Sequence, residues 1–124
     1  MNFDDKIPIY YQIKNHLYYQ IVAGTLAPGV KLPSVRQLAV DVTANVNTVQ
    51  HALTEMLDEK IIESKRGKGN FVTEDIDSIK QLKDKLVIEQ ISLSYKKLHA
   101  LSLTDTEIIT EFKKYMKNRS DIND

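Results

Sequence analysis

The most informative part of this sequence is residues 34–57, which read SVRQLAVDVTANVNTVQHALTEML. Ser34 precedes Gln37 by three residues, which is the spacing of a capping box at the start of a short helix. The polar run TANVN interrupts the apolar pattern, and Asn45 or Asn47 within it can cap a second helix. The apolar residues of this second helix recur at helical spacing, at Val49, Ala52, Leu53, Met56 and Leu57. The stretch therefore predicts two short helices that flank a tight turn.

The flanking segments complete a small domain. Upstream, an amphipathic helix is predicted over residues 8–23, with Pro8 at its first position and Gly24 just past its end. Its apolar residues repeat every fourth position, at Ile9, Ile13, Leu17 and Ile21. Downstream, the apolar-rich pieces IIES and GNFV stand on either side of KRGKG, as in a β-hairpin whose glycines relax the loop. Three helices and a hairpin predict a winged helix over residues 1–74.

A second, helical region is predicted at the C-terminal end. From about Ile76 to Leu98 the apolar residues follow a helical period, and Thr104 and Glu107 form a second capping box that opens one more helix. These apolar stripes have too few partners within one chain, so we expect residues 75–124 to join two copies of it. The predicted fold class is mainly α with a small β-hairpin: a winged helix-turn-helix followed by a two-helix dimerisation region.

Composition argues against several classes of protein. The chain has 124 residues, of which 42% are hydrophobic and 27% charged, as expected for a globular domain with a helical extension. It has no cysteine, its three histidines are scattered, and no acid, base and nucleophile converge, so we expect no metal, no cofactor and no enzymatic activity. No apolar run could span a membrane and the N-terminus does not resemble a signal peptide, which favours the cytoplasm. The net charge of zero neither supports nor excludes nucleic acid.

The second helix of the 34–57 stretch has a polar outer side. Its apolar residues leave a set of polar side chains facing outwards: Asn47, Thr48, Gln50, His51 and Thr54. Asn and Gln side chains can bond bidentately to adenine in the major groove of DNA, and Thr hydroxyls suit phosphates. An ordinary solvated helix face is the alternative interpretation. Arg36, near the start of the preceding helix, fits either a surface charge or a contact to phosphate or guanine.

The loop KRGKG is the second candidate site. It places Lys65, Arg66 and Lys68 around Gly67, and glycine lets backbone amides approach a phosphate. A nucleotide-binding loop would instead join a strand to a helix and carry a Lys-Ser or Lys-Thr pair. The residues favour the wing of a winged helix, with a merely solvated hairpin tip as the alternative.

Residues 7–73 resemble the DNA-binding domain of the GntR family of bacterial regulators through four motifs in the same order and spacing: PIYYQI, GTLAPGVKLPSVRQLA, NVNTVQHAL and RGKGNFV. The C-terminal region resembles the YtrA-like subfamily, whose members dimerise through such a pair of helices. The resemblance implies that operator DNA is contacted by the motif arginine, the turn and the early recognition helix, here Arg36, Asn45, Asn47, Thr48 and Gln50. It also implies that the wing enters or borders the minor groove through Arg66, Gly67 and Lys68.

The protein so implied is a homodimeric transcription regulator that binds a two-fold symmetric operator of double-stranded DNA, with repression favoured over activation. A winged-helix module that contacts another protein is the alternative. Two short helices can hardly enclose a ligand pocket, so a small-molecule effector remains unknown, and a groove at the dimer interface is where one could bind. Three residues depart from the family pattern. His51 replaces a frequent arginine, Val46 a frequent proline, and Lys60 the usual glycine after the recognition helix. Lys60 must therefore avoid or tolerate a left-handed conformation.

Overall fold

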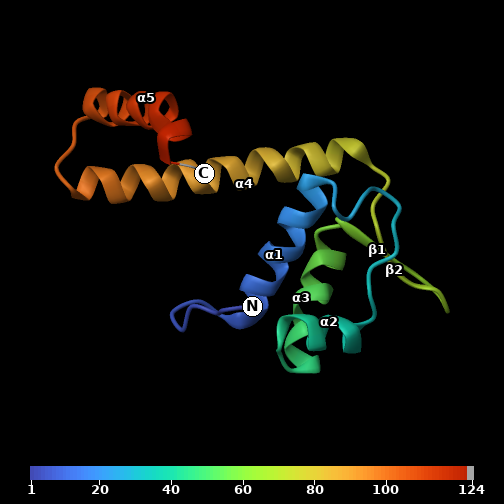
Figure 1. The fold of residues 1–124 in the computed structure, drawn as a ribbon. Helices are drawn as coiled ribbons and strands as arrows, with labels where there is room; N and C mark the ends of the chain where they lie inside the picture. The colour runs from blue at the N-terminus through green and yellow to red at the C-terminus, as the bar shows by residue number, and fades with distance from the viewer. Residues whose placement is uncertain (123–124) are drawn as a thin grey trace. The chain divides into compact units, whose positions relative to one another are not determined.

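The computed structural model describes residues 1–122 (Figure 1). Within them the helices and strands follow in the order α1 (Ile9–Ala23), α2 (Val35–Val42), α3 (Val46–Asp58), β1 (Ile62–Lys65), β2 (Gly69–Val72), α4 (Ile76–Ala100) and α5 (Asp105–Ile122). This order confirms the predicted fold class of a winged helix-turn-helix followed by two helices. No helix in this part of the chain is long and apolar enough to cross a membrane.

The chain divides into two compact units, residues 1–83 and 84–124. The division falls inside α4, whereas the boundary predicted after residue 74 falls just before this helix. The predicted dimerisation region of residues 75–124 remains a prediction, and its last two residues lie outside the described part of the chain.

The core of the first unit is formed by α1 and α3. Ile13, Leu17 and Ile21 are buried as predicted. The α3 stripe is buried at Val49, Ala52, Leu53 and Met56, whereas its last member, Leu57, is half-buried. Ile9 was expected on the same stripe but is 43% exposed. A residue four positions away is rotated by about 40° in an α-helix, so a strict four-residue repeat drifts off the buried face within a few turns. The buried face instead continues through Lys14 and Tyr18.

Local capping explains where the helices begin. Pro8 is the N-cap of α1 rather than its first helical residue, and its carbonyl accepts hydrogen bonds from the next turn. Ser34 Oγ accepts from the Gln37 backbone N–H at 3.1 Å, but the Gln37 side chain donates to Asp41 at 2.7 Å, so only half of this capping box forms. Asn45 is the residue that caps α3, accepting from the Asn47 backbone N–H at 2.7 Å.

The hairpin is part of a slightly larger β structure than the sequence predicts. Strands β1 and β2 pair antiparallel with Ile62 opposite Val72, and β1 begins one residue later than the piece IIES. The segment before α2, expected to be a plain connection, pairs with the other edge of β2 through a bridge between Lys31 and Phe71. Leu32 donates its backbone N–H to the Asn70 carbonyl at 2.8 Å. Strand β2 is therefore paired along both of its edges.

The second unit contains α4 from residue 84 onwards, a short turn and α5. The predicted capping box forms in full, because the Thr104 backbone N–H donates to Glu107 at 2.9 Å and the Glu107 backbone N–H donates to Thr104 Oγ1 at 3.2 Å. The hydrogen bonds that Thr104 makes to the Glu107 carboxylate, first of all that of its backbone N–H, lower the pKa of this carboxyl. Tyr95 donates its hydroxyl to Asp105 at 2.9 Å and links the two helices.

Candidate nucleic-acid interface

The outward face of α3 carries the predicted base-reading residues. Asn47 and Gln50 are exposed and Thr48 is half-buried. Within residues 1–122 no hydrogen bond or ion pair holds the Asn47 side chain, and Gln50 makes only a long contact of 3.4 Å to Thr54 Oγ1. Asn45 differs, because its Oδ1 is used to cap the helix and only its amide N–H groups remain to donate.

The turn between α2 and α3 fixes how α3 is presented. Thr43 ends α2 with φ 56° and ψ 56°, a left-handed conformation that costs a β-branched residue about 1–2 kcal/mol. The Ala44 backbone N–H donates to the Ala39 carbonyl at 3.0 Å and closes the turn. Strain held in this way at a turn is common beside functional surfaces.

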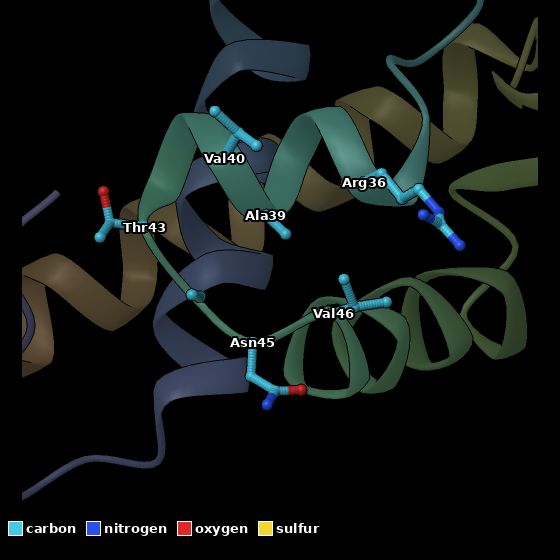
Figure 2. Close-up of a pocket in the computed structure, with 7 residues that line it drawn as sticks. Arg36, Ala39, Val40, Thr43, Asn45 and Val46 are labelled. Carbon is cyan, nitrogen blue, oxygen red and sulfur yellow. The ribbon is translucent and has the colours of Figure 1, made fainter.

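An open hollow of about 610 Å³ lies where α2 meets the start of α3. Its lining is mostly apolar and consists of Arg36, Ala39, Val40, Thr43, Ala44, Asn45 and Val46. Figure 2 shows Val46 pointing from α3 towards α2, while Arg36 extends from α2 towards α3. The Arg36 guanidinium is exposed and free of ion pairs in the described chain, so it can bind an external acceptor.

The wing places its charges at the tip of the hairpin. Lys68 donates its backbone N–H to the Lys65 carbonyl at 2.8 Å, which closes a tight turn with Gly67 at φ 73°. A positive φ at the third position of a turn favours glycine. Lys65 Nζ lies 4.5 Å from the centroid of the Phe71 ring, so this cation is held against the strand, whereas Arg66 and Lys68 are exposed at the tip.

A buried polar cluster behind α3 was missed in the sequence. Lys14 is only 7% exposed, and its Nζ lies 2.8 Å from Glu55 and 3.0 Å from Glu59. Tyr18 donates a short hydrogen bond to Glu59. The cluster joins α1 to the C-terminal half of α3 and thereby sets the orientation of the recognition face.

The pKa values of Lys14 and Tyr18, the two buried members of this cluster, are both raised. Burial alone would lower the pKa of Lys14, but the hydrogen bonds and charges of Glu55 and Glu59 outweigh it and raise this pKa. Burial raises the pKa of the Tyr18 hydroxyl, and its hydrogen bond to Glu59 raises it further. Lys14 is therefore charged and Tyr18 neutral at any physiological pH.

Two departures from the family pattern have a visible structural role. His51 stacks on Tyr10 with ring centroids 3.7 Å apart and lies 3.6 Å from Glu55, so it faces α1 as well as solvent. Lys60, which replaces the usual glycine after the recognition helix, has φ 63° and therefore adopts the left-handed conformation instead of avoiding it.

Taken by residue type, this surface is suited to bind a polyanion with polar edges, because it combines exposed amides with exposed cations. No group of three His, Cys, Asp or Glu side chains among residues 1–122 could hold a metal ion. An exposed polar helix after a tight turn, next to a basic hairpin, defines the class of winged helix-turn-helix DNA-binding proteins.

Comparison with known proteins identifies the family. The model of the family described as bacterial regulatory proteins, gntR family, matches residues 9–72. The chain belongs to this family, as the four motifs predicted.

Three relatives show how far the likeness extends, and two of them cover about nine tenths of this chain. The HTH-type transcriptional regulator YhcF of Bacillus subtilis (strain 168) is 38% identical over 113 residues, which cover 91% of this chain and 93% of that protein. The HTH-type transcriptional repressor YtrA of the same organism is 46% identical over 67 residues, 54% of this chain and 52% of that protein. A GntR family transcriptional regulator from Listeria monocytogenes has a TM-score of 0.83 at 37% identity, covering 90% of this chain and 98% of that one. The chain is accordingly a transcription regulator of the GntR type and not an enzyme.

Proposed function

We propose that the protein is a homodimeric, cytoplasmic transcriptional repressor that binds a two-fold symmetric operator of double-stranded DNA. The observation that carries this proposal is the exposed polar face of α3, where the Asn47 and Gln50 side chains have amide groups available for base edges. Repression is supported by the relative YtrA, which is named a transcriptional repressor.

The proposed contacts divide into two roles. Asn47 and Gln50 read bases in the major groove, with Arg36, Asn45 and Thr48 beside them. The wing residues Lys65, Arg66, Gly67 and Lys68 hold the phosphate backbone next to the minor groove, because a point charge is satisfied by any phosphate whereas an amide pairs with a particular base edge.

Dimerisation is supported by the apolar surface of the second unit. The exposed apolar side chains of this unit include Val87, Ile88, Ile91, Leu93, Ile109, Phe112 and Met116. So many large apolar residues on a region of about 40 residues exceed what a monomer usually leaves in water, and a second copy of the chain would cover them.

The operator is found by letting the 124-residue chain select duplexes from a random pool and sequencing them. We expect an inverted repeat whose half-sites lie about 34–36 Å apart, one helical turn of DNA, and a footprint over both. Selection of single strands, or of no sequence at all, would refute DNA reading and leave the protein-contact module as the better interpretation.

The dimer is tested separately by charge. Ile88→Glu and Ile109→Glu each place a carboxylate on the exposed apolar surface, so we expect them to sediment as monomers and to bind a two-half-site duplex far more weakly. Lys96→Glu changes an exposed residue of α4, the helix that also carries Ile88. It is the matched control and should sediment as a dimer. Dimers in all three variants would place the interface elsewhere.

A further inference from the structure

An apolar side chain lies beside the polar residues on the outward face of α3. Val46 is the first residue of this helix and is 45% exposed, next to the exposed polar residues Asn45 and Asn47. It lines the hollow between α2 and α3 together with Val40, which is 72% exposed (Figure 2). Apolar exposure at this place is not needed for folding, because the α3 core is already filled by Val49, Leu53 and Met56.

The chemistry of the DNA major groove offers one kind of partner for such a side chain. Base edges there present hydrogen-bond donors and acceptors, and the 5-methyl group of thymine is the apolar feature among them. We propose that Val46 is a specificity-determining residue that contacts the 5-methyl group of a thymine in each half-site. This inference rests on the proposed operator binding. It adds a residue, Val46, that recognises a base through an apolar contact and not through hydrogen bonds.

The position of the thymine follows from the helix. Val46 and Gln50 are four residues apart and therefore lie on the same side of α3, about 6 Å apart along its axis. Neighbouring base pairs are about 3.4 Å apart, so the thymine lies one or two base pairs from the base that Gln50 reads. Arg36 lines the same hollow and its guanidinium is exposed, so it lies close to the proposed thymine contact.

The test removes one methyl group at a time. In the duplex that the protein selects from a random pool, each thymine of a half-site is replaced in turn by deoxyuridine, which differs only by lacking the 5-methyl group. We expect one position at which the wild-type protein loses about fourfold in affinity per half-site, the effect of one buried carbon. With Val46→Ala, the ratio of thymine to deoxyuridine affinity at that position should fall towards one.

The matched control is Val30→Ala, because Val30 is 42% exposed but lies before α2 and outside the hollow, and this variant should keep the wild-type ratio. The inference is overturned if no deoxyuridine weakens binding of an otherwise tight duplex, or if Val46→Ala keeps the wild-type ratio. Either result leaves operator binding standing, whereas a protein that selects no duplex refutes the proposed function itself. Alanine is a better helix former than valine, so Val46→Ala folds.

Discussion

Replacing Lys60 by glycine should stabilise this protein. Lys60 follows α3 at φ 63°, where its backbone N–H donates to the Leu57 carbonyl at 3.0 Å. The next residue, Ile61, donates to the Met56 carbonyl at 3.1 Å, which completes a Schellman motif. The backbone geometry is thus the one that glycine usually supplies, with a lysine in its place.

The size of the effect comes from two opposing terms. A side chain in the left-handed region costs about 1–2 kcal/mol, because Cβ crowds the following carbonyl. Glycine loses more backbone entropy on folding, which costs roughly 0.5–1 kcal/mol. The Lys60 side chain is exposed, so its removal loses little packing. We expect Lys60→Gly to raise the free energy of unfolding by about 0.5–1 kcal/mol, or a few degrees in Tm.

The measurement is urea unfolding of the 124-residue chain at one fixed concentration, since the stability of the proposed dimer would depend on concentration. Lys60→Ala is the matched control, because alanine removes the same side chain but keeps Cβ, and it should leave the unfolding free energy nearly unchanged. A gain in both variants would trace the effect to the lysine charge. No gain in Lys60→Gly would show that the left-handed residue is not strained.

Three further predictions concern binding and pH. Affinity for the selected duplex should fall a hundredfold or more between about 50 and 200 mM salt, measured by titration, and affinity that ignores salt would contradict the phosphate contacts. Gln50→Ala should cost about 1–3 kcal/mol of binding free energy on the selected duplex and little on random DNA, whereas Lys68→Ala should weaken binding to both alike. If only Lys68→Ala lowered the ratio of selected-duplex affinity to random-DNA affinity, the wing would be the part that reads sequence. The pKa values of Lys14 and Tyr18 are raised above their ordinary 10.5 and 10.0, so the stability they contribute is present below about pH 10 and is lost as the pH rises through the folded-state values. Unfolding followed from pH 8 to 11.5 should show this loss, and Lys14→Met should reduce it.

Local signals predicted most of the elements. The caps at Asn45 and Thr104 and the four-residue apolar repeats depend on neighbours within one or two turns, so the sequence alone places the helices. Where a local competitor existed the prediction was incomplete: the Gln37 side chain turned to Asp41, one turn ahead, instead of back to Ser34.

The missed features all depend on distant partners. Lys14 and Glu55 are 41 residues apart, and each reads as an ordinary surface charge until α1 is packed on α3. The spacing of Lys14 and Tyr18, and of Glu55 and Glu59, was the available signal, since each pair is one turn apart. The pairing of Lys31 with Phe71 has the same cause. The nine predicted DNA contacts stay predictions, with Asn45 now known to serve the helix cap as well.

The strand pairing ahead of α2 has a consequence for the spacing of the DNA contacts that one copy of the chain can make. Leu32 is bonded to β2 and Ser34 caps α2, so a single residue separates the sheet from the helix-turn-helix. The wing and the recognition helix α3 are therefore expected to move as one rigid body, with a fixed distance between them. In the proposed complex, the interval between the bases read by α3 and the phosphates held by the wing is set by the protein. Inserting one base pair between them should then cost the wing contacts outright, while insertions between half-sites act on the dimer instead.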